Sequence, residues 1–165
     1  MIKQPFDDTH ITLTGCVLSR HLSSVDAELL SEKFALSDPW LTLGISATPL
    51  KHYFLREDSH LYRYAVRVDN DLAGIICLRY PWLRGPYIEL LGLIDSYRGQ
   101  GIGTQLLNWA EAEARHQSSN LWLATSSFNH TALQFYQRHG FQQIATIEGL
   151  VHPNYDELLL RKRLV

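Results

Sequence analysis

The stretch "DSYRGQGIGTQLL", residues 95–107, is the most informative part of the sequence. It places three glycines within five positions, after the apolar segment 87–94 and before an amphipathic segment that continues to about residue 116. Bare backbone lets an anion reach the unpaired N–H groups at the N-terminus of a helix. A strand, a glycine loop and a helix in this order therefore predict a phosphate-binding turn.

Three alternative roles for these glycines fit the spacing less well. A plain turn would need only one glycine. A Walker A loop would need a lysine after the glycines, and none follows. In the dinucleotide motif GxGxxG the third glycine would fall on Thr104 or Leu106, and no acidic residue ends the next apolar segment, 121–125. The spacing thus disfavours a Rossmann-type nucleotide enzyme.

The pattern on either side of the loop alternates between strand and helix signals. Ser23 and Asp26 have the spacing of a capping box, Thr48 and Pro49 suggest the start of a short helix, and we expect Trp40 in an exposed loop between them. We expect strands near residues 10–14, 60–68, 72–80, 87–94, 121–125, 141–147 and 156–164, and helices after residues 23, 48, 101 and 129. The resulting order is β-α-α-β-β-β-α-β-α-β-β, an α/β (α+β) fold.

Composition limits the function classes. The 165 residues are 45% hydrophobic and 19% charged, and the net charge is −2, so we expect a single domain over residues 1–165 without a nucleic-acid or membrane surface. The first ten residues lack the apolar segment of a signal peptide. Cys16 and Cys77 lie in apolar surroundings without metal or redox spacing, which favours reduced core thiols in the cytoplasm and no metal site.

Two motifs together resemble the GNAT N-acetyltransferase superfamily. The loop Arg98-Gly99-Gln100-Gly101-Ile102-Gly103 is similar to the family's pyrophosphate loop, and "NHTALQFYQRHGF", 129–141, is similar to its second signature. The resemblance covers essentially the whole chain and is strongest over 87–141. It implies a mixed, mostly antiparallel sheet of six to seven strands with helices on both faces.

The resemblance also implies a reaction, in which an acetyl group passes from acetyl-CoA, as co-substrate, to a primary amine by direct attack in a ternary complex. Backbone groups of Leu91 and Leu93 would bind the pantetheine arm, and one of them would polarise the thioester carbonyl. The full set implied to bind the cofactor is Leu91, Gly92, Leu93, Arg98, Gly99, Gln100, Gly101, Ile102, Gly103, Thr104, Asn129 and Tyr136.

Two residues are candidates for proton transfer. The resemblance implies that Tyr136 protonates the departing thiolate, although it could also be a core aromatic beside Phe135. Glu89 is the candidate base, because a carboxylate inside an apolar strand is costly to bury without a partner; it could instead pair with Arg79 or Arg84. Asn129 would bind pantetheine, cap the helix, or do both. A base acting through water, or an amine that is already neutral, stays open.

We expect the acceptor to be the amine of a small molecule or of a peptide. We expect acceptor specificity to come from the first two helices, the loop around Trp40, the turn 80–87 and the loop 148–156. Aromatic residues there, next to acidic groups, would suit a small cationic amine: Trp40, His52, Tyr53, Trp82, Tyr87, His152 and Tyr155, with Asp38, Glu89 and Asp156. A catalytically silent acyl-CoA sensor with the same fold is the alternative function. The apolar last strand leaves a homodimer open.

Overall fold

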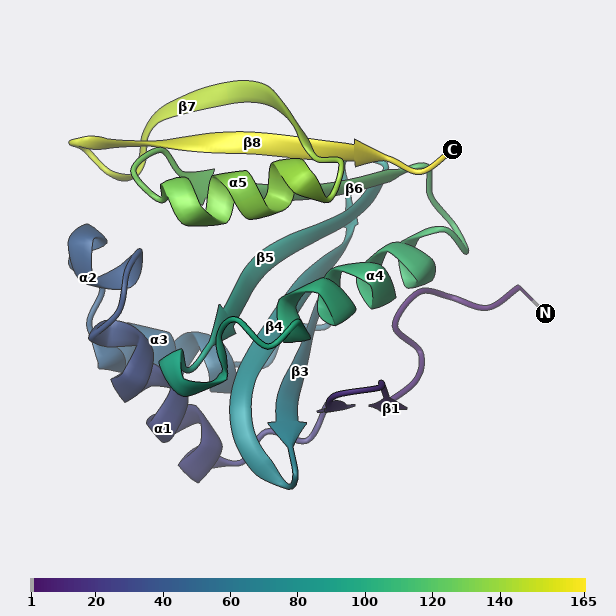
Figure 1. Ribbon diagram of the computed structural model, residues 1–165, viewed down its shortest axis with the longest axis horizontal. Coiled ribbons are helices and arrows are strands. Elements are labelled where there is room, and N and C mark those ends of the chain that lie inside the picture. Colours follow the sequence, from purple (N-terminus) through teal and green to yellow (C-terminus); the bar gives the residue numbers. More distant parts are fainter. Residues whose placement is uncertain (1) are drawn as a thin grey trace.

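A computed structural model describes residues 2–165 as one sheet with helices around it (Figure 1). The elements in chain order are β1 (His10–Thr12), β2 (Val17–Ser19), α1 (Ser24–Ala35), α2 (Trp40–Leu43), α3 (Ala47–Leu55), β3 (Leu61–Val68), β4 (Asp71–Trp82), β5 (Gly85–Leu93), the 3₁₀ turn η1 (Asp95–Tyr97), α4 (Ile102–Ala114), β6 (Asn120–Ser126), α5 (His130–Arg138), β7 (Gln142–His152) and β8 (Tyr155–Arg163).

Within residues 2–165 the sheet has eight strands in the order β1-β2-β3-β4-β5-β6-β8-β7. Among the described strands only the pair β5–β6 is parallel, which confirms a mixed, mostly antiparallel sheet. The predicted count of six to seven strands was too low, because the segment predicted as one strand at 10–14 is the first arm of a short hairpin. Its turn is closed by the N–H of Leu13, which donates to the carbonyl of Cys16 at 2.9 Å.

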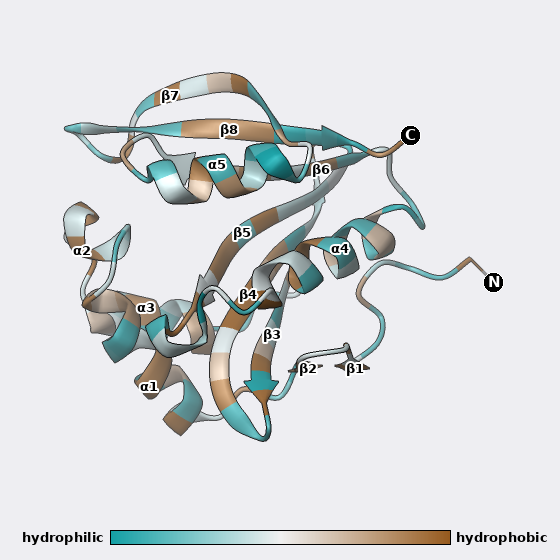
Figure 2. Cartoon of the chain, viewed as in Figure 1, coloured by the Kyte–Doolittle hydropathy of each residue, from teal (hydrophilic) through white to brown (hydrophobic). Residues whose placement is uncertain are grey.

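Helices cover both faces of the sheet, as predicted, and each face has its own hydrophobic core. Strand β4 contributes to both: Ile76 packs against α4 on one face, and Ile75 packs against α1 and α3 on the other. Figure 2 shows hydrophobic colouring along β4 in the middle of the molecule. Cys16 and Cys77 are buried and unpaired with each other, one in each core.

The helix starts agree only in part with the sequence. The capping box of Ser23 and Asp26 is present at α1. Helix α3, however, has Ser46 rather than Thr48 at its N-cap. Trp40 does not lie in an exposed loop: it begins the short helix α2, is only 8% exposed, and stacks on Phe34 with 4.7 Å between ring centroids. Its stacking partner is on α1, so local sequence could not reveal its burial.

Among residues 2–165, no helix combines the length and hydropathy that crossing a bilayer would require.

The strands β5 and β6 diverge, and this opens the centre of the sheet. They are paired only at Tyr87–Trp122 and Ile88–Leu123, although β5 continues to Leu93. A bulge in β5 leaves Glu89 without a direct partner on β4. Bulges bend a strand and redirect side chains, and they are common beside active sites. The divergence leaves the backbone edge of the second half of β5 unpaired on the side of β6.

Candidate active site

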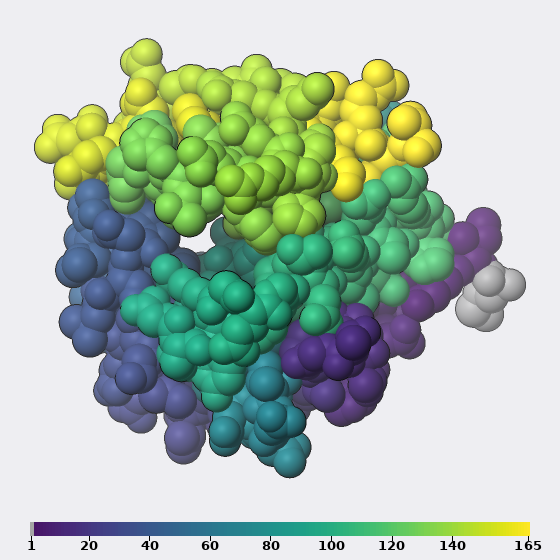
Figure 3. Space-filling model, in the orientation of Figure 1, coloured from purple at the N-terminus to yellow at the C-terminus, as the bar shows by residue number. Residues whose placement is uncertain are grey.

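A cavity of about 750 Å³ lies where β5 and β6 separate. Its walls come from β5, the end of β6, the loop and first turn of α4, one side of α5, the α2 region and the β7–β8 hairpin. In Figure 3 the surface is hollowed between α2 and α5, above the loop that leads into α4. Eleven of the twelve residues expected to bind the cofactor line this cavity; the exception is Gln100, whose side chain donates to the carbonyl of Ser96 at 3.0 Å.

Glycine is required at the three positions of the loop for two different physical reasons. Gly99 and Gly101 have positive φ values of 73° and 80°, and a Cβ added at either would meet nothing within 4 Å. Their conformation requires glycine, and the space beside them is open. Gly103 instead allows close packing, because a Cβ there would lie 3.1 Å from the ring of Phe135.

The N-terminus of α4 is available to an anion. Gly101 is its N-cap, and the first N–H that bonds within the helix is that of Gln105, which donates to Gly101. The N–H groups of Ile102, Gly103 and Thr104 precede it and have no intrahelical acceptor. The Arg98 side chain, 49% exposed, lies next to them and forms a 3.4 Å ion pair with Asp95. A concave set of N–H groups beside an exposed cation suits a pyrophosphate.

The free edge of β5 presents further backbone groups to the cavity. Ile94 donates its N–H to Ala73 at the start of β4. Because backbone polar groups alternate in direction along a strand, those of Leu91 and Leu93 point to the opposite side, where β6 has separated. The Nε of Arg98 donates to the Leu93 carbonyl at 3.3 Å, which agrees with that orientation.

Helix α5 carries the other cofactor candidates. Asn129 is its N-cap and accepts from the N–H of Ala132 at 3.3 Å, so the predicted capping role is present. Tyr136 lies half-buried between Phe135 and Phe141 and also lines the cavity, so it is both a packed aromatic and a cavity residue. Burial raises the pKa of Tyr136 to about 12, which keeps the phenol protonated at neutral pH.

Glu89 lies in the cavity wall and is ion-paired. Its carboxylate accepts from the Nε and a terminal nitrogen of Arg79, both at 3.2 Å, and from the hydroxyl of Tyr53 at 2.9 Å. Arg79 also contacts Asp58 at 3.1 Å. The pKa of Arg79 is raised, mainly by its hydrogen bond to Glu89. Of the two partners that the sequence suggested, the structure selects Arg79, so Glu89 belongs to a charge network.

The aromatic residues expected around an acceptor separate into groups. Trp40 and Tyr87 line the cavity, and Tyr53 reaches it through Glu89. Trp82 lies behind Tyr87, stacked on it at 4.7 Å. The other three aromatic residues expected around the acceptor do not line the cavity: His52, His152 and Tyr155. Asp156 does not line it either.

The sequence did not single out Glu157, which lies in the cavity wall and is 6% exposed. Its neighbour Asp156 is the residue that the sequence suggested. The available signal is a carboxylate at the head of the apolar run "ELLL" in a predicted strand, the same kind of signal that indicates Glu89.

The sequence matches the Acetyltransferase (GNAT) family over residues 26–141. A streptothricin acetyltransferase from Streptomyces lavendulae is 37% identical over 79 residues, which are 47% of this chain and 42% of that protein. An aminoalkylphosphonate N-acetyltransferase from Salmonella typhimurium is 38% identical over 90 residues, 50% of this chain and 56% of that protein. The chain thus spans about half the length of these two relatives.

Solved structures agree on the fold. A GNAT family acetyltransferase from Elizabethkingia anophelis with acetyl-CoA bound superposes with a TM-score of 0.68 at 20% identity, over 92% of this chain and all of that one. The family match covers more than half of the chain and includes both the glycine loop and the second motif. The chain belongs to the GNAT family of acetyltransferases.

Proposed function

We propose that this protein transfers an acetyl group from acetyl-CoA to a primary amine, by direct attack while both substrates are bound. The observation that carries the proposal is one cavity in which the glycine-cradled start of α4, the free edge of β5 and Tyr136 meet. The structural neighbour that carries bound acetyl-CoA supports the same cofactor.

The residues present fit acetyl-CoA, whose contribution when bound is an acetyl group activated as a thioester. The N–H groups of the loop from Gly99 to Thr104, with Arg98, would hold its pyrophosphate. The backbone of Leu91 and Leu93 would hold the pantetheine arm, joined by Asn129. These are mainly backbone contacts, for which the loop conformation and the separated strand are the structural requirement.

Tyr136 would donate a proton to the departing sulfur. A phenol that remains protonated over the working pH range can do this without carrying a charge itself. Glu89 is the base that the sequence favours, and its cavity position supports that role, whereas its bonds to Arg79 hold it as an ion pair.

Buried thiols at Cys16 and Cys77 support the cytoplasm as the working compartment.

The acceptor we propose is a small cationic amine. The cavity wall contains the carboxylates Asp38, Glu89 and Glu157 and the aromatic rings of Trp40 and Tyr87. Such a set suits an ammonium group. The names of the two relatives specify a streptothricin and an aminoalkylphosphonate, so both compounds are rational first acceptors, with a peptide N-terminus as the third.

Thermal unfolding with and without acetyl-CoA tests the cofactor site. At about one hundred times Kd, binding adds about 2.7 kcal/mol to the free energy of unfolding, a rise of about 5–10 °C in Tm. The rise should shrink in Arg98→Ala. No rise in the wild-type protein would refute the proposal.

Release of free thiol from acetyl-CoA in the presence of the three amines then separates an enzyme from a sensor. An enzyme releases thiol only when an acceptor is present. Stabilisation by acetyl-CoA without thiol release with any amine would favour the silent acyl-CoA-binding alternative.

A further inference from the structure

Glu157 is a carboxylate buried in the wall of the cavity. It lies on β8 between two strands, opposite Ser126 of β6 and Ile147 of β7. Its side chain therefore extends from the centre of a three-strand segment, and only 6% of the residue is accessible. It shares the cavity with Tyr136 and with the β5 segment where β5 leaves β6. A buried acid at this point has a functional or a structural reason.

Contacts within the fold do not fully stabilise this buried carboxylate, because Glu157 has no cationic partner among residues 2–165. The one side chain that hydrogen-bonds it is Ser126, whose hydroxyl donates to Oε1 at 2.6 Å. Burial raises the pKa of Glu157 and the serine hydrogen bond only partly opposes this, with no basic side chain contributing. One neutral donor does not compensate a buried carboxylate, which ordinarily requires a charged partner.

Two other shielded glutamates show how this protein satisfies an acid. Glu113, 7% exposed, accepts from Lys3 at 3.2 Å and from the backbone N–H of Phe6 at 2.8 Å. Glu89 has two hydrogen bonds from Arg79 and one from Tyr53. Glu157 is thus the exception, and its open side faces the cavity.

The charged and titratable groups around Glu157 do not supply the missing cation. On β5, Tyr87 is close enough that Glu157 contributes to raising its pKa to about 12, after burial and Glu89. On the hairpin, Asp156 precedes it on β8 and Glu148 lies on β7, and neither is a cation. The other titratable residues in the cavity wall are Asp38, Glu89, Arg98, Tyr136 and Arg138. Of the two arginines, one pairs with Asp95 at the cofactor end and the other lies in the last turn of α5.

We propose that Glu157 binds the ammonium group of the acceptor and removes its proton before attack. This assignment rests on the proposed acetyl transfer. It makes Glu157, rather than the ion-paired Glu89, the catalytic base, and it makes Ser126 a positioning residue that orients the carboxylate. A cationic acceptor would complete the pairing that the protein leaves open.

The proton balance of this step closes. The ammonium gives one proton to Glu157, which becomes a neutral carboxylic acid, and the freed lone pair forms the new C–N bond. As the C–S bond breaks, Tyr136 gives its proton to the sulfur and regains one from the acetylated nitrogen. The proton on Glu157 leaves to solvent as the products depart, so the products are the amide, the free thiol and one proton.

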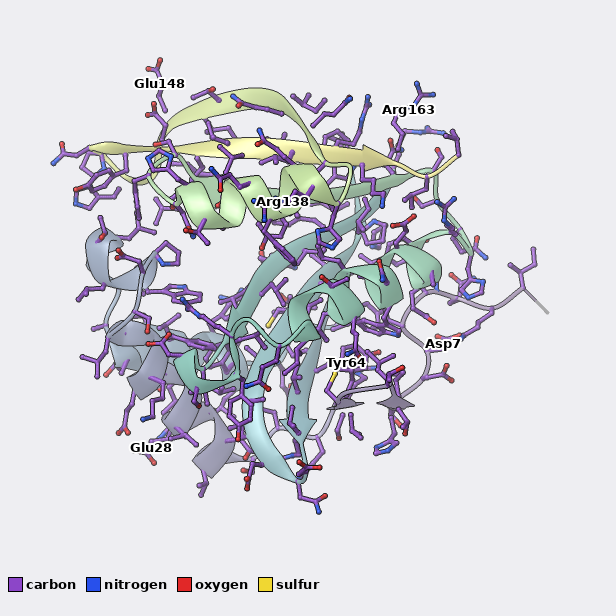
Figure 4. All side chains as sticks on the ribbon, in the orientation of Figure 1. Asp7, Glu28, Tyr64, Arg138, Glu148 and Arg163 are labelled. Carbon is purple, nitrogen blue, oxygen red and sulfur yellow. The ribbon has the colours of Figure 1, made fainter. Side chains whose placement is uncertain are left out.

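Thiol release with the full chain, saturating acetyl-CoA and each of the three proposed amines tests the assignment: streptothricin, an aminoalkylphosphonate and a peptide with a free N-terminus. Glu157→Gln should lower kcat/KM by at least about 100-fold. The matched control is Glu148→Gln on β7, where the side chain extends outward from the hairpin (Figure 4); it should stay within about threefold of wild type. Both variants should keep the rise in Tm with acetyl-CoA, which separates failure at Glu157 from failure of the cofactor site.

The pH profile distinguishes a base from a structural residue. In the wild-type protein kcat/KM should fall as the pH drops and Glu157 takes up a proton, and this acidic limb should be absent in Glu157→Gln. Ser126→Ala removes a hydrogen bond that stabilises the carboxylate, so the limb should move to higher pH. Nearly normal turnover in Glu157→Gln, or loss of the limb in Glu89→Gln instead, overturns the assignment.

A binding readout covers amines that are not turned over. In protein with ¹³C-labelled glutamate carboxyls, the Glu157 signal is the one missing from Glu157→Gln. Its titration midpoint should lie above that of ordinary glutamate and should fall when a cationic amine is added to the complex with free CoA, from which no acetyl group can be transferred. A midpoint that none of the three amines moves overturns the proposal.

Discussion

At the scale of single residues, burial gives Tyr136 and Glu157 complementary tasks. Both are desolvated side chains in the wall of the same cavity, and for both burial raises the pKa. A raised pKa keeps a phenol available as an acid, and it makes a carboxylate a stronger base when ionised. The two groups are therefore suited to opposite directions of proton transfer at the same pH.

Tyr136→Phe should reduce kcat by about 100-fold and leave the Tm rise with acetyl-CoA unchanged, because only the proton donor is lost. Since the pKa of Tyr136 is about 12, its ionisation should not reduce wild-type activity at neutral or mildly alkaline pH. Tyr155→Phe, which alters a tyrosine outside the cavity wall, is the control. Equal kcat in Tyr136→Phe and the control would show that sulfur leaves without this acid.

Glu157→Gln should make the fold more stable at neutral pH. Between the ordinary glutamate pKa and the raised folded-state pKa, the folded protein holds a proton that the unfolded chain has lost. The free energy of unfolding of the wild type therefore falls as the pH rises through that window, and the loss persists above it. In urea unfolding at about pH 8, the free energy of unfolding of Glu157→Gln should exceed that of the wild type by about 1–3 kcal/mol. The difference should vanish below about pH 4. A destabilised variant at the higher pH would mean that the carboxylate is compensated in the fold.

At the scale of elements, the loop before α4 combines a conformational and a binding requirement, and these can be separated by substitution. Gly101 and Gly44 both have positive φ, 80° and 71°, and a Cβ at either would meet nothing within 4 Å. Each starts or ends a helix, α4 or α2. Gly101 lines the cavity and Gly44 does not.

Gly101→Ala and Gly44→Ala should each cost about 1–2 kcal/mol of stability, because alanine is strained in the left-handed region. Only Gly101→Ala should lose the rise in Tm with acetyl-CoA, since its methyl group enters the space in front of the α4 N–H groups. Thermal unfolding of both variants with and without the cofactor measures this. The same acetyl-CoA response in both variants would contradict a pyrophosphate site at this loop.

The same elements show what local sequence can predict. The glycine loop, the β3–β4 hairpin and the caps of Ser23 and Asn129 depend on neighbours in sequence, and the structure has each of them. The burial of Trp40 and the isolation of Glu157 depend on partners on other elements. The separation of β5 from β6 is likewise set by long-range pairing, so local sequence indicated the glycine loop but not the opening of the sheet beside it.

At the scale of the whole molecule, the two hydrophobic cores share the strands β3 and β4, and this should make unfolding cooperative. Ile75 and Ile76 are adjacent on β4, both fully buried, and they pack into opposite cores. Ile75→Ala and Ile76→Ala should each cost about 2–5 kcal/mol through lost burial and a residual cavity. Because a strand cannot keep one face ordered while the other melts, both variants should shift one common transition.

Calorimetry measures this: the van't Hoff and calorimetric enthalpies should agree in wild type and in both variants. A second transition in either variant would show that the helices on one face unfold on their own, and the acceptor side of the cavity, built partly by α2, would then open independently of the cofactor side.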